Sequence, residues 1–167
     1  MPNWCANHAI FSHEDESQVN RLVEAFNKSE FFQTFRPMPD ELKDTVSPGE
    51  VNPALVAKYG ASNWYDWCIQ NWGCKWDTQT EDGSAERDGL SVTMNFDTAW
   101  SPPIIFYDFM AEQGWTIEAY YFEPGMSFCG TWDTETGDEY YEIGSDDIPE
   151  ILTDMFGIED FYDEDND

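Results

Sequence analysis

The sequence predicts an α+β fold built on an antiparallel sheet, and three observations support this class. Two segments, Leu90–Phe96 and Thr116–Glu123, alternate apolar and polar residues as half-buried strands do. Other segments carry apolar residues at helical spacing. The 12 Phe, 8 Tyr and 8 Trp residues supply bulk for a core in a chain of 167 residues. We therefore expect most of the chain to fold, despite a formal net charge of -28.

The first strand and the first helix are predicted at the N-terminus. Trp4–Phe11 is a short segment with apolar residues at Ala6, Ala9, Ile10 and Phe11, which suits a strand. An amphipathic helix follows, with apolar residues at helical spacing: Val19, Leu22, Val23 and Phe26. Ser12 and Asp15 have the spacing of a capping box at its start.

A helical insert is predicted at about residues 31–73. Phe31–Pro53 contains three internal prolines and a glycine, so it is expected to form a long loop. Pro53–Tyr59 suits a short helix that ends at Gly60. A second helix is expected between Ser62, as its N-cap, and Gly73 just past its end.

The second half continues with a strand, a helix and another strand. After the strand Leu90–Phe96, Ser101-Pro102 is a typical helix start, and Gly114 is a typical stop. The buried face of this helix is expected to contain Ile105, Phe106, Phe109 and Met110. In the strand Thr116–Glu123, one face is expected to carry Ile117, Ala119 and Tyr121.

A hairpin and a final helix complete the predicted elements. Ser127–Asp133 and Glu139–Ile143 are expected to pair around a polar turn. Asp147 and Glu150 can form a capping box for a helix that ends at Gly157. The acidic segment 159–167 is expected to fray.

If Lys75–Asp77 forms one more strand, the element order is β-α-β-β-α-β with an added hairpin. That order is the ferredoxin-like, split β-α-β plan, with helices on one face of an antiparallel sheet. We expect one ferredoxin-like domain over residues 1–145, which includes the helical insert. The acidic C-terminal helix and tail, 146–167, are expected to pack on the same domain.

Charge is distributed unevenly along the chain. All seven basic residues lie within the first 87 positions, with 14 of the 35 acidic residues, whereas positions 88–167 carry 21 acidic residues and no Lys or Arg. Mutual repulsion among these carboxylates opposes the compact state. Two explanations stay open: an acidic surface adapted to solubility or high salt, and a surface that meets a strongly positive partner.

The composition excludes several partners and compartments. A protein of this charge repels nucleic acid and anionic membranes. No apolar run approaches the roughly 20 residues of a membrane span, and the N-terminus does not open a secretory signal. The four cysteines lie far apart, and we expect reduced thiols in a cytoplasmic protein: Cys5, Cys68, Cys74 and Cys129.

Four separated motif blocks carry a family resemblance. They are Pro2–Asn7, the tryptophan-rich segment Trp64–Asp77, Asp97–Pro103, and Glu123–Gly125 with Phe128–Gly130. Together they resemble the YubB-like family of phage- and plasmid-encoded proteins with a ferredoxin-like domain, over roughly residues 1–133. The resemblance implies that fold and little about activity. Its mobile-element setting favours a role against host defence, in the host cytoplasm. Residues 134–167 hold no motif that we assign to the family.

The motif residues are expected to be structural, and they are Asn3, Trp4, Cys5, Asn7, Trp64, Trp67, Cys68, Asn71, Trp72, Gly73, Lys75, Trp76, Asp77, Trp100, Pro124, Gly125, Cys129 and Gly130. In a helix, Trp64, Trp67 and Trp72 share one broad face with Cys68 and Asn71. That face fits a tryptophan core, with each indole N–H bonded to backbone. A platform on which a sugar or base stacks is the alternative.

Metal and catalytic signatures are weak. Cys5, His8 and His13 lack the paired short spacings of zinc sites. Asp133–Gly144 departs from a calcium loop at its sixth and twelfth positions, which hold Asp138 and Gly144. No nucleophile, phosphate-loop or zinc-protease motif is present. We therefore expect no cofactor, no metal and no catalytic residue.

The acidic half favours a DNA mimic. Duplex DNA carries about one charge per 1.7 Å of its axis, and same-face carboxylates on a strand lie about 6.6 Å apart. Several such elements side by side could approach the charge density of DNA and occupy the basic channel of a restriction or CRISPR-type complex. The candidate partner-binding residues are Glu118, Glu123, Asp133, Glu135, Asp138, Glu139, Glu142, Asp146, Asp147, Glu150, Asp154, Glu159 and Asp160.

Other functions remain open from the sequence. One is a small-ligand-binding domain that uses the tryptophan-rich segment as its pocket. Another, with less support, is an enzyme whose site is not recognised, and an inert structural or partner role is a further possibility. The sequence does not predict an oligomeric state.

Overall fold

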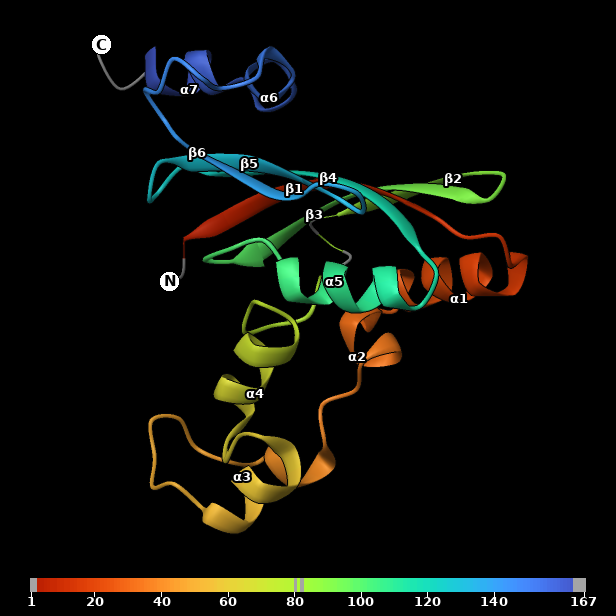
Figure 1. Ribbon diagram of the computed structural model, residues 1–167, viewed down its shortest axis with the longest axis vertical. Coiled ribbons are helices and arrows are strands. Elements are labelled where there is room, and N and C mark those ends of the chain that lie inside the picture. Colours follow the sequence, from red (N-terminus) through yellow and green to blue (C-terminus); the bar gives the residue numbers. More distant parts are fainter. Residues whose placement is uncertain (1–2, 80, 82, 164–167) are drawn as a thin grey trace.

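A six-stranded antiparallel sheet organises the protein. The computed structural model describes residues 3–79, 81 and 83–163. The strands lie in the order β2-β3-β1-β4-β5-β6 (Figure 1). They are β1 (Trp4–Ser12), β2 (Ser84–Asp88), β3 (Ser91–Ala99), β4 (Thr116–Glu123), β5 (Phe128–Asp133) and β6 (Gly137–Glu142). The order β2-β3-β1-β4 is the ferredoxin-like arrangement, so the predicted fold class is confirmed. The β5–β6 hairpin extends the sheet beside β4.

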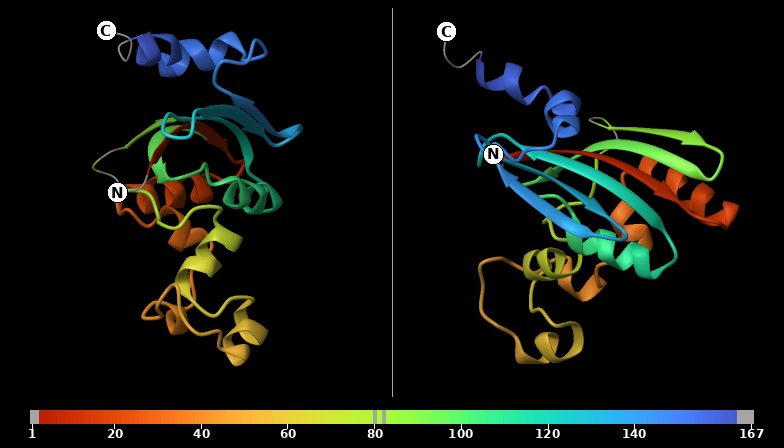
Figure 2. Two further views of the ribbon diagram at one scale, coloured as in Figure 1. Left: turned by 90° about the vertical axis from the view of Figure 1, so that its left-hand side faces the viewer. Right: turned by 45° about the horizontal axis from the view of Figure 1, so that its top comes forward.

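Helices lie on both faces of this sheet. The helical elements are α1 (Glu16–Asn27), α2 (Phe31–Phe35), η1 (Asp40–Leu42), α3 (Pro53–Tyr59), α4 (Trp64–Asn71), α5 (Ile104–Glu112), α6 (Glu150–Phe156) and α7 (Ile158–Asp163). We call the face toward α1, α2 and α5 the inner face, and the face toward α6 and α7 the outer face (Figures 1 and 2). The lobe with α3 and α4 extends from the inner side (Figure 1).

The inner face carries the main core, which is largely aromatic. Phe31, at the start of α2, is fully buried, and its ring centroid lies 5.5 Å from that of Phe11 and 5.1 Å from that of Phe106. Trp115 and Tyr107 are also buried against Phe11. The prediction of a loop over Phe31–Pro53 is therefore wrong at its start, because burial of its phenylalanines stabilises a short helix there.

The outer face has a second, smaller core, which the expectation of helices on one face missed. Tyr120 and Phe122 point outward from β4 and are buried beneath Leu152 of α6 and Ile158 of α7, together with Cys129 of β5. The β4 strand is thus apolar on both faces near its end, which is typical of a strand covered on both sides. The segment from Ile158 continues as a helix to residue 163, where a frayed tail was expected.

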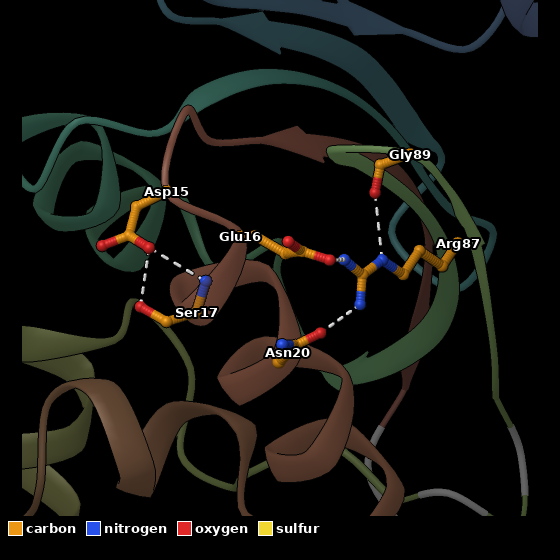
Figure 3. A network of polar contacts seen from close by, with 6 residues as sticks. All are labelled: Asp15, Glu16, Ser17, Asn20, Arg87 and Gly89. Carbon is orange, nitrogen blue, oxygen red and sulfur yellow. Dashed lines mark hydrogen bonds and ion pairs between the residues drawn. The ribbon is translucent and has the colours of Figure 1, made fainter.

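The β2 strand is an edge strand that the sequence did not reveal. Lys75–Asp77, proposed for that place, is not a strand. Arg87 ties β2 to the first helix: its guanidinium contacts Glu16 at 3.4 Å, donates to Gly89 O at 3.0 Å, and bonds to Asn20 (Figure 3). Nearly all of β2 is exposed, so it shows none of the apolar alternation from which strands are predicted.

Three predicted helix starts are corrected. Asp15 rather than Ser12 caps α1, since its carboxylate accepts the Ser17 N–H at 2.9 Å (Figure 3). Asn63 rather than Ser62 caps α4. The capping box of Asp147 and Glu150 is absent: Pro149 occupies the N-cap of α6, and no side chain caps it.

The α5 helix differs from its prediction in both start and buried face. It begins at Ile104, two residues after the predicted proline. Phe106, Tyr107 and Met110 are buried, whereas Ile105 is exposed. Tyr107 takes the central position because its ring stacks on Trp132 of β5, with centroids 5.5 Å apart.

Candidate functional site

Six of the seven basic residues contact groups of the inner side or of the insert lobe, and the seventh, Lys75, lies on the rings of Trp76 and Trp100. Lys28, Lys43 and Lys58 form ion pairs of 2.6–2.8 Å with neighbouring carboxylates. Arg21 and Arg36 donate to the carbonyl oxygens of residues 34 and 71 and stack on the rings of residues 35 and 109. These contacts occupy the cations within the first half of the chain. The carboxylates of β4, β5, β6 and α6 have no such partner in their own sequence region.

Three of the predicted acidic residues line one groove. It has a volume of about 490 Å³ and lies between the β4–β5 strands and the exposed Ile151 of α6. Glu118 and Asp133 are directly opposite each other across β4 and β5, and Glu135 follows in the β5–β6 turn. No Lys or Arg is among the residues that line it. The groove is therefore open to solvent. Its strand side is acidic, and its helix side, formed by Ile151, is apolar.

The turn that ends the groove is built by one of its own carboxylates. Asp133 accepts the backbone N–H groups of Glu135 and Thr136, both at 2.8 Å, and the Thr136 hydroxyl at 2.6 Å. These hydrogen bonds lower the pKa of Asp133, with the Thr136 hydroxyl as the largest cause. Asp133 thus remains ionised, and Glu135 projects from a turn of fixed shape.

The C-terminal carboxylates lie on the outer side of the sheet but do not line this groove, to which Ile151 alone contributes from the α6–α7 segment. Helices α6 and α7 turn Leu152 and Ile158 toward the sheet. Their polar residues consequently face solvent, and the predicted acidic residues here are exposed: Asp146, Asp147, Glu150, Asp154, Glu159 and Asp160. Glu139 of β6 is exposed on the same face of the sheet as Asp133, since it pairs with Thr131.

Glu123 does not belong to the acidic surface, so its assignment there is wrong. Its side chain is 0% exposed, and its two oxygens accept the N–H groups of Gly125 at 2.7 Å and Met126 at 2.8 Å. A buried carboxylate needs such donors, because losing water costs several kcal/mol per ion. Glu123 therefore shapes the β4–β5 turn rather than meeting a partner.

Asp138 and Glu142 are also displaced from the predicted surface, because successive side chains of β6 alternate between faces. Both point to the inner side, where Asp138 is opposite Trp132 and accepts the Tyr121 hydroxyl at 2.7 Å. Asp138 lies close to Asp108 of α5. The pKa of Asp108 is raised by its partial burial and by the negative charges of Glu112 and Asp138. The sequence analysis did not identify this inner acidic group of Asp108, Glu112 and Asp138. The i, i+4 spacing of Asp108 and Glu112 places both carboxylates on one side of a helix and could have indicated it.

The tryptophan-rich helix α4 contributes to the core. Trp67, Cys68 and Trp72 are buried, and the Trp72 indole N–H donates to Arg36 O at 2.9 Å. The Asn71 side chain donates to Trp67 O at 2.8 Å. Trp64 is half-buried beside the same core. These contacts leave no stacking platform on the helix face that the sequence had offered for a sugar or base.

The separated motif blocks meet at one end of the sheet, where β1 begins and β3 and β4 end. The Trp100 N–H donates to Asn3 O at 2.8 Å. A Cβ on Gly125 would lie only 2.5 Å from the Asn3 side chain, so any larger residue there would displace Asn3. Ser101 donates its hydroxyl to Gly73 O at 2.8 Å.

Other motif residues hold the strands and the insert. The Asn7 amide donates to Cys5 O, Phe96 O and the Thr98 hydroxyl at 2.9–3.2 Å. Asp77 accepts the N–H groups of Phe32 and Gln33, which links the insert to α2. Gly130 lies against Tyr121, whose hydroxyl would be 2.2 Å from an added Cβ. Pro124 follows the buried Glu123, and Cys129 belongs to the outer core.

Three motif tryptophans nevertheless remain exposed at this end: Trp4 by 43%, Trp76 by 40% and Trp100 by 51%. The Trp4 and Trp76 ring centroids are 6.1 Å apart. The Lys75 ammonium lies 4.2 Å from the centroid of Trp76 and 5.7 Å from that of Trp100. We call these three rings the indole cluster.

Nothing in the described ranges resembles a metal or thiol site. No group of three His, Cys, Asp or Glu residues is placed to hold a metal ion among residues 3–79, 81 and 83–163. Cys5 and His8 point to opposite faces of the sheet, since they are an odd number of residues apart on one strand. All four cysteines are buried free thiols. Burial raises the pKa of Cys68 to about 12 and that of Cys129 to about 11.

No helix among the described residues has both the length and the apolar character needed to cross a membrane.

Comparison with known proteins identifies the domain. The sequence model of a family described as the ferredoxin-like domain in Api92-like protein matches residues 71–162. The chain belongs to this family. The match reaches beyond residue 133, where the sequence offered no motif to assign, and it includes the β5–β6 hairpin and α6, so these acidic elements are part of the family domain.

A solved structure supports the same fold. The protein api92 from Yersinia pseudotuberculosis matches with a TM-score of 0.50 and 12% sequence identity, over 89% of this chain and 100% of that chain. At this identity the likeness concerns the fold alone. No protein with a curated description matches the chain.

Proposed function

We propose that this protein is an acidic binding protein that acts as a DNA mimic, and that it blocks the basic nucleic-acid channel of a host defence complex of the restriction or CRISPR type. The observation that carries the proposal is the groove lined by Glu118, Asp133 and Glu135 without a basic residue. A groove of this charge attracts Lys and Arg side chains and repels nucleic acid itself. The partner is therefore a protein, and neither a membrane nor DNA.

The arrangement of charge around the groove supports the same function. Glu139 continues the acidic sheet face, and Glu150 and Asp154 project from the helix above it. Outward carboxylates on a strand and a helix repeat at about 6–7 Å, which is the scale of phosphate spacing along one DNA strand. All seven basic residues precede position 88, and none of them lines the groove.

The biological setting is proposed from the resemblance to phage- and plasmid-encoded YubB-like proteins. Such a protein acts in the host cytoplasm, needs no cofactor and performs no catalysis. Its inhibition is stoichiometric, and it associates rapidly at low salt because opposite charges steer the encounter.

Binding of a small ligand by the tryptophan-rich segment is less well supported. Trp64 and Trp67 of α4 pack in or against the core, and the exposed rings of the tryptophan-rich segment are those of Tyr65 and Trp76.

The proposal is tested by competition against duplex DNA. Purified restriction and CRISPR-type complexes are incubated with labelled DNA at 50, 150 and 300 mM NaCl, and the protein is titrated in. We expect at least one complex to release its DNA, with an inhibition constant that weakens steeply as salt rises. A panel in which no complex releases DNA at 50 mM NaCl contradicts the proposal.

A matched pair of variants assigns the effect to the groove. The groove variant carries Glu118→Gln, Glu135→Gln and Glu139→Gln, and the control carries Glu14→Gln, Asp44→Asn and Glu50→Gln, which are exposed elsewhere. Each variant removes three charges. At about 0.5–1 kcal/mol per interfacial charge, the loss of three charges weakens inhibition by the groove variant about 10- to 150-fold. Equal inhibition by the two variants would place the partner elsewhere.

A further inference from the structure

The indole cluster combines exposure with a constrained backbone. Trp100 has φ = +75°, a left-handed conformation that bulky residues rarely adopt. It is held there by the hydrogen bond from its N–H to Asn3 O and by the Ser101 hydroxyl on Gly73 O. Despite this constraint the Trp100 side chain is half exposed. Core packing therefore does not explain why a tryptophan occupies this strained position.

A cation already lies on these rings. The Lys75 ammonium is over the Trp76 ring and within 6 Å of the Trp100 centroid, which is the range of a cation–π interaction. In a chain with 35 acidic residues, Lys75 forms no ion pair with any residue that the structure describes. The Lys75 ammonium thus lies on indole rings and not in an ion pair with a described residue, so the cluster can hold a cation.

The cluster also adjoins the acidic side of the sheet. Trp4 lies on the outer face, the same face as Ala6, whose partner across β1 and β3 is Asp97. Glu86 is a further carboxylate on this face, opposite Thr93. The fold therefore places exposed indole rings next to a sheet face that attracts cations, in a protein of net charge -28.

We propose that the indole cluster is a second contact site for the basic partner, where an Arg or Lys side chain of that partner stacks on Trp76 and Trp100 in place of Lys75. This inference rests on the proposed function. Exposed aromatic residues are typical anchors of protein interfaces, and guanidinium groups stack well on indole. The bound arginine gains the ring contact, and the displaced Lys75 ammonium returns to water.

The direction in which one substitution changes the affinity distinguishes this proposal from a site for an anion or a nucleotide. Removal of the competing charge by Lys75→Met tightens binding of a cationic ligand. The same substitution weakens binding of a phosphate-bearing ligand, which needs the ammonium. Trp76→Ala weakens binding of both the cationic and the phosphate-bearing ligand. This variant therefore shows where the site is, but not which charge it prefers.

The probe is a hexa-arginine peptide, titrated calorimetrically into the full chain at 150 mM NaCl. We expect Trp76→Ala and Trp100→Ala each to weaken the Kd about two- to five-fold, and Lys75→Met to tighten it by a similar factor. Tyr65→Ala, an exposed aromatic residue of α4, serves as the control and leaves the Kd unchanged. Weaker binding by Lys75→Met, or wild-type binding by both tryptophan variants, overturns the inference.

Nuclear magnetic resonance gives a readout that does not depend on variants folding. During the peptide titration the indole N–H signals of Trp4, Trp76 and Trp100 shift, while those of the buried Trp67, Trp72 and Trp115 stay in place. Unshifted signals from the exposed three contradict the proposal.

The DNA competition assay distinguishes this inference from the proposed function. If the wild-type protein releases DNA from no complex while its indole signals shift on addition of the peptide, the cation site stands and the proposed function fails. If the groove variant loses competition while the indole variants bind the peptide normally, the function stands and this inference fails.

Discussion

The two faces of the sheet are built from the same strands and differ in what they bury and expose. The inner face carries a large aromatic core, and six of the seven basic residues are held on that side or in the insert lobe by ion pairs, carbonyl oxygens and rings. The outer face carries a small core under α6 and α7 and an acidic groove. The difference indicates that stability is concentrated on the inner face, while the outer face is free to present uncompensated charge.

The largest expected effect comes from the inner core. Phe31→Ala removes a fully buried ring that contacts the rings of Phe11, Phe26 and Phe106, among others. We expect a loss of about 3–5 kcal/mol in the free energy of unfolding, from lost burial and the cavity that remains. Urea denaturation followed by circular dichroism measures it. A loss below about 1 kcal/mol would show that the inner core does not dominate stability.

Leu152→Ala probes the outer core in the same way. Leu152 is fully buried in a much smaller cluster. We therefore expect its removal to cost about 2–3 kcal/mol of stability, and this loss should appear as local opening of α6 and α7. Amide hydrogen exchange should accelerate in α6 while β1 and β3 keep their protection. Equal acceleration throughout the sheet would mean that the two faces unfold as one unit.

A variant of Glu123 tests whether this carboxylate has a structural role rather than a role in partner binding. Glu123→Gln replaces one of two accepting oxygens by an NH₂ group that cannot accept a hydrogen bond, and it leaves a backbone N–H of the turn unpaired. We expect about 1–3 kcal/mol of destabilisation from this buried donor. The exposed Glu142→Gln is the control, expected within about 0.5 kcal/mol of wild type. Thermal denaturation of both variants compares them directly, and an equal loss argues against a structural role for Glu123.

A pH dependence of stability is expected from Asp77. Burial is the main cause that raises the pKa of this carboxyl to about 6, from an ordinary value of 3.8, while the N–H groups of Phe32, Gln33 and Thr78 lower it. Because the pKa is raised on folding, the associated stability is present below pH 4 and is lost as pH rises through 6. Between pH 4 and 7 the Tm of the wild type should fall more steeply than that of Asp77→Asn. Parallel profiles would exclude Asp77 as the cause.

The sequence predicted the ferredoxin-like plan because its central strands and helices follow clear periodicities. Leu90–Phe96 and Thr116–Glu123 alternate, and the first helix has a regular apolar stripe. The β2 strand was missed because an exposed edge strand buries almost nothing and shows no alternation. The final helix was predicted, but its position on the outer face was missed because the outward Tyr120 and Phe122 were not considered as a second apolar face.

Site residues were predictable by type but not by placement. Charge segregation identified Glu118, Asp133 and Glu135, which do line one groove. The burial of Glu123 depends on two backbone N–H groups in a turn whose shape the sequence does not specify. The indole cluster joins Trp4, Trp76 and Trp100 from three segments, and only the strand order brings them together.

The most direct test of the division between the faces is the salt dependence of inhibition. For a nuclease complex that the protein inhibits, the logarithm of the inhibition constant is measured against the logarithm of NaCl concentration for wild type, the groove variant and its matched control. We predict a shallower slope for the groove variant alone, because fewer charges then contribute to the contact. A slope that falls equally in both variants would contradict the account, since any three carboxylates of the surface would then serve as well as those of the groove.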